Sequence, residues 1–275
     1  TTRCCENACW NPLYPGPAMF DLHAWLVALA TLLTAGALTW LVSVAQRNVT
    51  IVDSLWPVLF MLAALAYAAS VPSPGPRTAL VIALVSIWGL RLGGYLTWRN
   101  HGKPEDHRYQ AIRARNEPNF AFKSLYLIFG FQAVLATVIS VPLLGAINSV
   151  APLGTLDWAG VALWATGFAF EAGGDWQLAR FKADPANAGK VMDRGFWRYT
   201  RHPNYFGDFC IWWGFYLIAA GAGGWWSIVG PALMTLLLLK VSGVALLEKD
   251  IGERRPAYAD YIRRTNAFFP GPRKA

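Results

Sequence analysis

Charged residues are scarce in this sequence. They make up 15% of the 275 positions, whereas 55% are hydrophobic and the mean hydropathy is +0.32. Soluble domains carry about 25% charged residues, so this composition excludes an ordinary water-soluble globule and indicates a membrane protein. The formal net charge is +8. Because the basic residues lie within a turn or two of apolar runs, we interpret the excess as a topology signal and predict no nucleic-acid partner.

Cysteine is also scarce, and metal and dinucleotide motifs are missing. The cysteines are Cys4, Cys5, Cys9 and Cys210, with no C-x-x-C pair and no histidine at a metal-ligand spacing. The sequence therefore predicts no metal site, and it leaves one disulfide among the first three cysteines as an open alternative. No G-x-G-x-x-G motif follows a strand-like run, and no internal repeat is visible. A nucleotide site would have to be built without the Rossmann loop.

Long apolar runs are abundant. Seven of them are near the roughly 20 residues that a bilayer-spanning helix needs. They cover approximately residues 24–44, 55–71, 79–98, 122–147, 158–179, 205–222 and 225–247. The sequence thus predicts an all-α integral membrane protein with seven transmembrane helices. In this interpretation residues 21–275 form a single transmembrane domain, and residues 1–20 stay unassigned because they resemble neither a span nor a cleavable signal.

Basic residues gather in three segments, which sets the expected orientation. They occupy residues 99–123, 180–201 and 249–274, whereas the intervening loops 71–77, 148–157 and 221–224 are nearly uncharged. By the positive-inside rule the basic segments face the cytoplasm. With seven spans, the N-terminus is then outside and the C-terminus is cytoplasmic.

Ionisable residues inside the apolar runs are the next signal, because each is by default a candidate functional residue. Five polar groups stand out, in chain order: Asp53; Trp88, Arg91 and Tyr95; Glu171, Asp175 and Lys182; His202, Asn204 and Asp208; and Glu248, Lys249 and Asp250. Under the predicted topology each group lies in the cytoplasmic half of its helix, and only Lys240 is mid-span. We therefore predict a polar cavity open to the cytosol. The structural alternative is a set of interhelical hydrogen bonds, each worth about 1 kcal/mol or less.

One segment combines basic, aromatic and hydrogen-bonding residues just before an apolar span. Residues 195–208 read Gly-Phe-Trp-Arg-Tyr-Thr-Arg-His-Pro-Asn-Tyr-Phe-Gly-Asp. Such side chains at the entrance of a membrane helix are costly unless a polar ligand occupies the site, and a phosphorylated dinucleotide is a suitable ligand. The alternative is that Arg198, Arg201 and His202 are only cytoplasmic flank charges, and that Pro203 merely opens a helix.

This segment resembles the C-terminal signature of the steroid 5-alpha-reductase family, which the related sterol C14-reductases share. The resemblance extends from Asn48 to Pro270 and is strongest in the last third, which includes Glu248 and the run from Tyr258 to Tyr261. It implies a bacterial enzyme with seven transmembrane helices in the inner membrane, surrounded by lipid, with its active site facing the cytoplasm. It also implies NADPH as reductant and a 3-oxo-4-ene steroid, or a similar apolar enone, whose C4–C5 double bond is reduced.

The resemblance also implies roles for individual residues. The cofactor-binding positions are Arg91, Lys103, Glu171, Asp175, Lys182, Arg194, Arg198, Arg201, His202, Asn204, Tyr205, Asp208, Glu248 and Lys249. The substrate-binding positions are Asp53, Trp56 and Trp88, and the catalytic positions are Asp53 and Tyr95. The match is incomplete, because Glu171 stands where the steroid enzymes have asparagine, Asp53 replaces a glutamate and Trp88 replaces a tyrosine.

The implied chemistry delivers a hydride to the β-carbon of the enone while a hydrogen-bond donor holds its carbonyl oxygen. Asp53 can donate only when it is protonated; otherwise Tyr95 or a water has to serve, and the proton source for the α-carbon is open. The alternative function belongs to another class, the S-adenosylmethionine-dependent membrane methyltransferases of the isoprenylcysteine or phospholipid type. These enzymes share an Arg-His-Pro-x-Tyr segment, but the combination of Asn204 with Asp208 favours the reductase.

Overall fold

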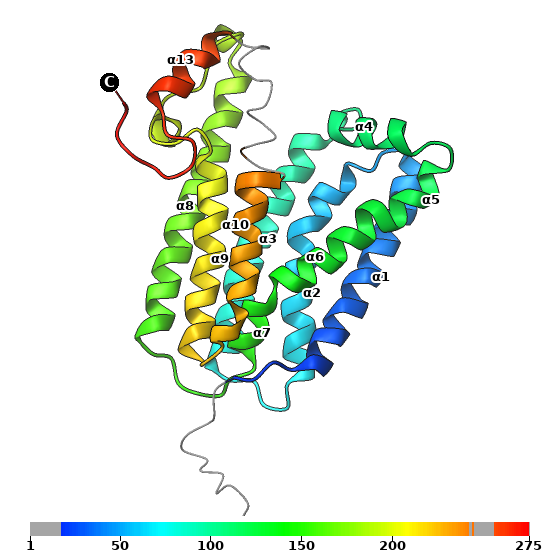
Figure 1. Cartoon of the computed structure of the whole chain (residues 1–275), viewed down its shortest axis with the longest axis vertical. Coiled ribbons are helices and arrows are strands. Elements are labelled where there is room, and N and C mark those ends of the chain that lie inside the picture. The colour runs from blue at the N-terminus through cyan, green and yellow to red at the C-terminus, as the bar shows by residue number, and fades with distance from the viewer. Residues whose placement is uncertain (1–17, 242–243, 245–255, 275) are drawn as a thin grey trace, which may run out of the picture.

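The computed structural model describes residues 18–241, 244 and 256–274, whose regular structure is entirely helical (Figure 1). Three long helices come first: α1 (Leu22–Gln46), α2 (Ile51–Ser70) and α3 (Pro76–Asn100). A short helix, α4 (His107–Asn116), lies across one end of the bundle. The chain returns through α5 (Phe120–Ser124), the π-helical stretch η1 (Leu125–Gly130), α6 (Phe131–Ile139) and α7 (Val141–Ile147).

The second half of the chain adds two more long helices, α8 (Thr155–Ala183) and α9 (Pro203–Gly221). The short 3-10 turns η2 (Pro185–Asn187) and η3 (Gly195–Arg198) lie between them. A further turn, η4 (Trp225–Ile228), leads into α10 (Val229–Leu236), the π-helical stretch η5 (Leu237–Val241) and, later, α13 (Pro256–Arg264). In Figure 1, α8, α9 and α10 lie side by side, and α1, α2 and α6 form the other side of the bundle.

Within the described residues, four helical segments are long and apolar enough to cross a membrane: α1, α2, α3 and the segment Phe120–Ile139. They make the chain a multi-pass integral membrane protein. With 29 and 19 residues, α8 and α9 are also of spanning length, but carboxyl groups and glycines lower their hydropathy. The seven spans and their orientation therefore stay predictions, and the seventh apolar run ends in residues outside the described ranges.

The fourth apolar run differs from the single straight helix that its hydropathy predicted. A π-helical stretch interrupts it at Leu125–Gly130, and a break at Ser140 separates α6 from α7. Pro142 lies in the first turn of α7. Proline has no backbone N–H, and it fits best in a first turn, where that donor is not needed.

Several helices begin where the sequence carries a start signal. Asp21 Oδ1 accepts a hydrogen bond of 2.9 Å from the Ala24 backbone N–H at the start of α1, as helix N-caps do. Asp106 caps α4 in the same way. Pro76 and Pro203 occupy the first turns of α3 and α9, where the missing N–H costs nothing.

Buried aromatic rings form the centre of the bundle. Phe60 on α2, Trp88 on α3 and Trp212 on α9 are fully buried. The ring centroids are 4.5 Å apart for Phe60 and Trp212, and 5.9 Å apart for Trp88 and Trp212, which meet edge to face. Aromatic pairs of this kind add about 0.5–1.5 kcal/mol beyond the area they bury. They fix three helices relative to one another beside the candidate site.

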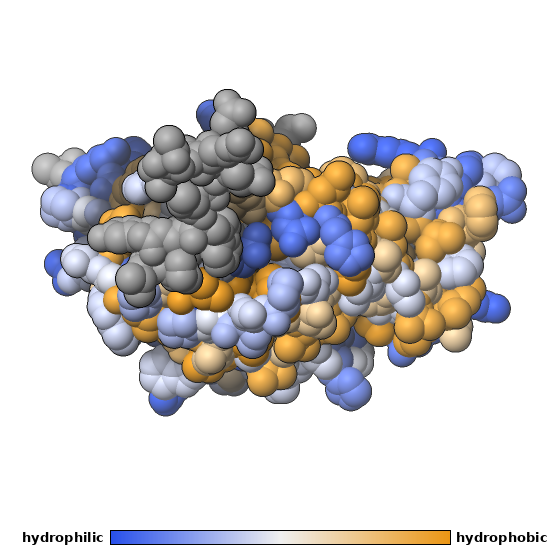
Figure 2. All heavy atoms as spheres, turned by 90° about the horizontal axis from the view of Figure 1, so that it is seen from below, coloured by the Kyte–Doolittle hydropathy of each residue, from blue (hydrophilic) through white to orange (hydrophobic). Residues whose placement is uncertain are grey.

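Apolar side chains also cover much of the exterior. On α1, Leu22, Leu26, Leu33 and Leu41 are all exposed. Figure 2 views the molecule from below, along the helices, and shows hydrophobic and hydrophilic residues side by side at this end. In water, exposed leucines such as those on α1 would mark an interaction surface, whereas in a membrane protein they contact lipid.

A buried ion pair joins three helices at the end of the bundle opposite α4. Arg77 Nε and Nη2 donate to Oδ1 and Oδ2 of Asp157, each at 2.7 Å, and the two side chains are 1% and 0% exposed. Arg77 also donates to the backbone carbonyls of Ala151, Pro152 and Gly221. The pair therefore ties the start of α3 to the start of α8 and the end of α9. Because the two charges cancel internally, this end still presents the nearly uncharged loops that the sequence predicted.

Candidate functional site

Two rows of glycines bring α8 and α9 into close contact. Gly160, Gly167 and Gly174 recur every seven residues on α8, and Gly207 and Gly214 have the same spacing on α9. A Cβ placed at Gly167 would lie 2.4 Å from the Gly207 carbonyl oxygen, and one at Gly160 would lie 2.6 Å from that of Gly214. Small residues allow membrane helices to approach this closely. The polar side chains beside the glycines on the two helices are thereby brought together.

We expect Gly207→Ala to lower the free energy of unfolding by about 1–3 kcal/mol, the usual cost of overpacking. The added Cβ would lie 2.4 Å from the Gly167 carbonyl oxygen, so the two helices have to separate. The matched control is Gly94→Ala on α3, where a Cβ meets no atom within 4 Å. This control should be neutral, or more stable by about 0.5–1 kcal/mol. Denaturant titration of both variants in detergent micelles measures the difference, and equal stabilities would contradict the close glycine contact.

Polar side chains from α3, α8 and α9 meet in the interior of the bundle. Arg91 Nη1 lies 2.8 Å from Asp175 Oδ2 and 3.7 Å from Glu171 Oε1. Glu171 Oε2 accepts a hydrogen bond of 2.9 Å from Trp88 Nε1. Asn204 Nδ2 donates to Asp175 Oδ1 at 3.3 Å. The structure thus brings together candidate residues from three separate apolar runs.

Asp208 completes this group, which we call the inner cluster: Arg91, Glu171, Asp175, Asn204 and Asp208. Asp208 lies one turn after Asn204, within electrostatic range of Glu171 and Arg91. Its Oδ1 atom is buried without a hydrogen-bond partner among the described residues, as are Nε and Nη2 of Arg91, and the Trp212 side chain lies close enough to interact with Asp208. Unsatisfied buried polar atoms are rare because each costs about 1–3 kcal/mol. Their concentration here marks a place where a ligand can supply the missing partners.

An open cleft of ≈ 480 Å³ reaches the inner cluster between α3 and α8. Its polar lining residues are Arg91, Tyr95, Asp175 and Arg180, and the rest of the lining is alanine and tryptophan. The hydroxyl of Tyr95 makes no hydrogen bond to the residues that the structure describes, and the Arg99 guanidinium lies 5.9 Å from its ring centroid. A largely apolar hollow with a few convergent polar groups is the usual form of a small-molecule site.

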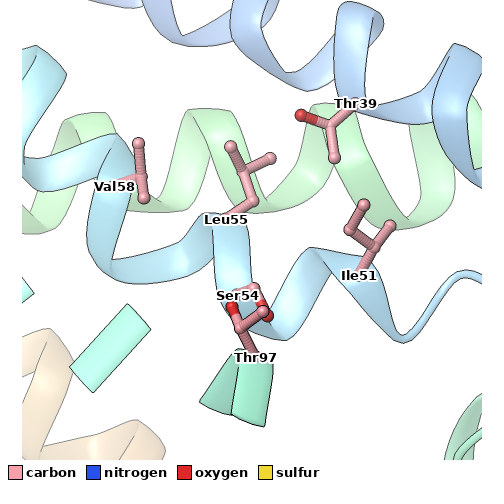
Figure 3. A pocket seen from close by; sticks show the side chains of 6 residues that line it. All are labelled: Thr39, Ile51, Ser54, Leu55, Val58 and Thr97. Carbon is pink, nitrogen blue, oxygen red and sulfur yellow. The ribbon is translucent and has the colours of Figure 1, made fainter. Parts of the chain in front are cut away.

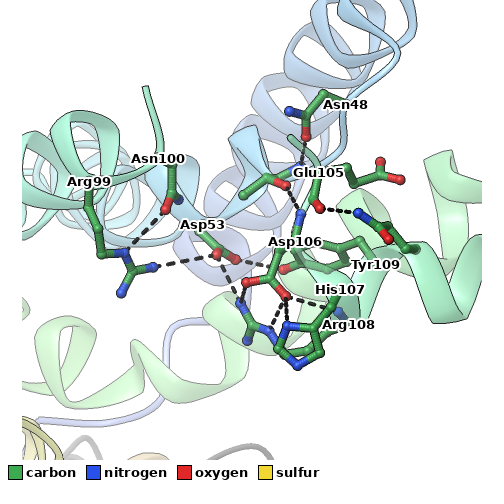
Figure 4. Close-up of polar contacts among 11 residues, drawn as sticks. Asn48, Asp53, Arg99, Asn100, Glu105, Asp106, His107, Arg108 and Tyr109 are labelled. Atoms are coloured by element: carbon green, nitrogen blue, oxygen red, sulfur yellow. Dashed lines mark hydrogen bonds and ion pairs between the residues drawn. The ribbon is translucent and has the colours of Figure 1, made fainter. Parts of the chain in front are cut away.

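Asp53 lies in a second group, the outer cluster, formed by Asp53, Arg99, Arg108 and Tyr109 (Figure 4). The Tyr109 hydroxyl donates to Asp53 Oδ1 at 2.6 Å, and Arg108 Nη2 donates to Oδ2 at 3.1 Å. Arg99 Nη2 lies 3.9 Å from the same Oδ2. In this arrangement the Asp53 carboxyl group is an acceptor beside two cations. Because Arg99 contacts both Asp53 and the ring of Tyr95, it links the outer cluster to the cleft.

Two further carboxylates, Glu105 and Asp106, lie at the start of α4, and Glu105 joins α4 to the loop before α2. Burial alone would raise the pKa of Glu105, but hydrogen bonds from Arg113 and from the Val49 backbone N–H outweigh it and hold this pKa below its ordinary value. The pKa of Asp106 is likewise lowered, because hydrogen bonds from Arg108 outweigh the effect of burial. Both groups are therefore ionised at neutral pH, so Glu105 keeps its ion pair with Arg113 and Asp106 keeps its ion pair with Arg108.

The basic residues expected to hold phosphate differ in their surroundings. Arg194 and Arg198 are exposed and make no ion pair with the described part of the chain. Lys103 and Lys182 are exposed as well. Arg201 is buried and donates to backbone carbonyls near the end of α13. It therefore docks the C-terminal segment onto the start of α9, whatever else it contacts.

The other predicted site residues are dispersed. His202 is buried and stacks on Tyr205 with ring centroids 5.6 Å apart. Tyr205 lies within electrostatic range of both clusters. Trp56 packs edge-on against the aromatic core. Glu248 and Lys249 lie outside the described residues.

A second hollow, of ≈ 340 Å³, lies among α1, α2 and α3 and is lined by the six residues labelled in Figure 3. Its threonine hydroxyls are already bonded to their own helices: Thr39 to the Ala35 carbonyl at 2.8 Å, and Thr97 to the Gly93 carbonyl at 2.7 Å. None of the predicted site residues lines it. The cleft between α3 and α8 is therefore the better candidate.

Comparison with known proteins places the chain in a family. Residues 39–265 match the family described as "Protein of unknown function (DUF1295)". The chain belongs to the DUF1295 family. This family is related to the steroid 5-alpha-reductase superfamily. The chain is also 28% identical over 290 residues to an uncharacterized protein of Schizosaccharomyces pombe, with 91% of this chain and 81% of the yeast protein covered. No solved structure matches it.

Some residues around the site were missed by reasoning from the sequence. Arg108 and Tyr109, the partners of Asp53, lie in a basic segment that was interpreted as a membrane flank, and no local pattern sets them apart. The glycine rows had a visible signal, the seven-residue spacing on both helices. Arg77 was overlooked because its partner, Asp157, is 80 residues away in the sequence.

Proposed function

We propose that this protein is an NADPH-dependent reductase of an apolar enone, with a 3-oxo-4-ene steroid as the expected substrate. The observation that carries the proposal is the inner cluster, whose side chains converge from three helices beside an apolar cleft and leave buried donors and an acceptor without partners. A cluster that only joined helices would satisfy its own polar groups. The relation of the DUF1295 family to the steroid 5-alpha-reductase superfamily also supports the proposal.

The residues present fit this cofactor. The exposed guanidinium groups of Arg194 and Arg198 suit phosphate, which arginine binds in bidentate fashion. At the other end of NADPH, the carboxamide group of the nicotinamide has both an N–H donor and a carbonyl acceptor. These complement the unpaired Oδ1 of Asp208 and the unpaired N–H groups of Arg91. When bound, NADPH would supply the hydride.

The substrate carbonyl needs a hydrogen-bond donor, and we assign this role to Tyr95. Asp53 already accepts hydrogen bonds from Tyr109 and Arg108, so it is poorly placed to donate. Tyr95 lines the cleft, and its hydroxyl has no competing partner in the described ranges. Asp53 then holds Arg99 beside the Tyr95 ring. The alanine and tryptophan lining of the cleft suits an apolar skeleton.

Ligand-dependent stability tests the proposal and its alternative together. NADPH at 100 times its Kd should stabilise the detergent-purified protein by about 2.7 kcal/mol, because it binds only the folded state. S-adenosylmethionine should leave the melting temperature unchanged. The opposite result, stabilisation by S-adenosylmethionine alone, would support the methyltransferase and overturn the reductase.

Turnover is the second part of this test. We expect NADPH oxidation only when an enone such as progesterone or testosterone is added, with the saturated ketone detected by mass spectrometry. If NADPH binds but no steroid in a panel is reduced, the assignment of the cofactor stands and the assignment of the substrate class is wrong.

A further inference from the structure

The C-terminal segment, residues 261–274, is bonded along its backbone to the loop before α9, residues 193–202. The segment is drawn in red in Figure 1. The Arg201 backbone N–H donates to the Asn266 carbonyl at 2.9 Å. Further hydrogen bonds run from Arg201 Nη1 to the carbonyls of Ile262 and Thr265, from Thr200 Oγ1 to those of Ala267 and Phe268, and from the Gly271 N–H to that of Tyr199.

The contact between the segment and the loop is closely packed. Tyr261 and Thr200 are 2% and 0% exposed. Phe268 is also buried and packs edge-on against Phe206 and Phe209 of α9, with ring centroids 6.2 Å and 5.7 Å apart. Because buried aromatic rings favour one arrangement, they keep the segment on the loop and protect the hydrogen bonds between them.

Arg198 lies between two of these hydrogen bonds. The carbonyl of Trp197 accepts one from the Tyr261 hydroxyl, and the carbonyl of Tyr199 accepts one from the Gly271 N–H at 3.1 Å. The guanidinium of Arg198 is exposed and makes no ion pair with the described part of the chain. The segment therefore fixes the backbone on both sides of Arg198 and leaves its side chain available to a ligand.

Arg194 is held in a similar way. Arg273 Nη2 donates to the backbone carbonyl of Asp193 at 2.6 Å and to its Oδ2 atom at 2.8 Å. Arg194 is the next residue, and its side chain is exposed. The segment thus sets the backbone beside both arginines to which we assign the phosphate groups.

The other side of the loop is fixed to α8, beside the inner cluster. Trp197 Nε1 donates to the Gly174 carbonyl at 3.0 Å, and the Phe196 N–H donates to Gln177 Oε1 at 3.0 Å. Gly174 is the residue before Asp175, which belongs to the inner cluster. The loop is therefore held from two sides, and one of its anchors on α8 is next to the cluster.

We propose that the C-terminal segment is a positioning element for Arg194 and Arg198, and that it raises the affinity of the protein for the phosphate-bearing half of NADPH. The second half of this proposal rests on the reductase function proposed above. Binding of phosphate immobilises an arginine and the loop that carries it, which costs conformational entropy. A loop that the segment has already fixed loses less of this entropy. None of residues 261–274 lines the cleft between α3 and α8, so the segment acts on cofactor affinity and not on the chemical step.

Hydrogen–deuterium exchange of the ligand-free, detergent-purified protein tests the contact without any cofactor. In Tyr261→Phe, the backbone N–H groups of residues 197–202 should exchange about 2–10-fold faster, the factor that corresponds to one hydrogen bond. Asp260→Asn, which alters an ion pair with Arg263 within α13, should leave their exchange unchanged. Unchanged exchange in Tyr261→Phe would overturn the positioning of the loop, whether or not the protein is a reductase.

Titration with adenosine 2′,5′-bisphosphate, which has phosphates but no nicotinamide, tests the effect on affinity. Tyr261→Phe should weaken binding by about 2–10-fold, and it should have no further effect in an Arg194→Ala/Arg198→Ala background. Arg273→Ala should also weaken binding, and Arg273→Lys, which keeps a donor for Asp193, should recover part of it. Equal effects of Tyr261→Phe in both backgrounds would show that the segment does not act through the two arginines, and would overturn the proposal.

Turnover separates this proposal from the reductase function. Tyr261→Phe should raise the KM for NADPH and leave kcat for enone reduction unchanged. A lower kcat with an unchanged KM would contradict the positioning role and leave the reductase intact. If the wild-type protein neither binds NADPH nor reduces an enone, the proposed function and the effect on affinity both fail, and the exchange experiment still decides whether the segment holds the loop.

Discussion

Arg77→Ala should lower the free energy of unfolding by about 3–5 kcal/mol, because it leaves the carboxylate of Asp157 buried without a counter-charge. The wild-type side chains are bonded at two positions, each 2.7 Å long. The substitution also removes the donors to three backbone carbonyls, two in the loop before α8 and one at the end of α9. Denaturant titration in detergent micelles, followed by tryptophan fluorescence, measures the loss.

Two variants make this result specific. Arg263→Ala breaks an exposed ion pair with Asp260, and it should change stability by about 1 kcal/mol or less. The double variant Arg77→Met/Asp157→Leu removes both buried charges and should be more stable than Arg77→Ala, since apolar replacements of buried pairs are often neutral. If Arg77→Ala behaved like the exposed control, the buried pair would not hold the three helices together.

Tyr95→Phe should lower kcat for enone reduction by about 10²–10³-fold, the effect of removing one donor from a developing oxyanion. NADPH affinity should barely change, because the polar groups of Arg91 and Asp208 are untouched. Steady-state kinetics gives kcat, and cofactor titration followed by intrinsic fluorescence gives the affinity.

The matched control is Tyr126→Phe, which removes the hydroxyl of an exposed tyrosine on η1, outside both clusters. It should change neither quantity. If Tyr95→Phe turns over normally, the donor lies elsewhere, and Asp53→Leu becomes the decisive variant. If Asp53→Leu loses activity while Tyr95→Phe stays active, the hydrogen bond to the substrate carbonyl is assigned to Asp53.

The sequence predicted the inner cluster because polar residues inside apolar runs are conspicuous. Arg91, Glu171 and Asp208 each stand out on their own helix, and a helical period is enough to assign their faces. Their convergence on one end followed from the loop charges, before any contact between helices was known. The membrane character was predicted for the same reason, since it depends on composition and not on tertiary contacts.

Contacts between distant segments could not be predicted in this way. Asp53 and Tyr109 are 56 residues apart, and nothing in the residues near either one indicates that they meet. The expectation that Asp53 donates to a substrate treated it as an isolated carboxyl group. The interruptions of the fourth apolar run were also missed, because hydropathy averages over a window and does not register a π-helical turn or the position of Pro142.

The close packing of α8 and α9 also determines which wall of the cleft is able to move. With 2.4 Å between a Cβ placed at Gly167 and the Gly207 carbonyl oxygen, the two backbones behave as one rigid unit. By contrast, α3 meets α8 chiefly through side chains: the Arg77–Asp157 pair at one end, and the bonds from Trp88 to Glu171 and from Arg91 to Asp175 beside the cleft. Of the two walls of the cleft, α3 is therefore the one that side-chain bonds hold in place, and α8 is the one fixed by close backbone contact.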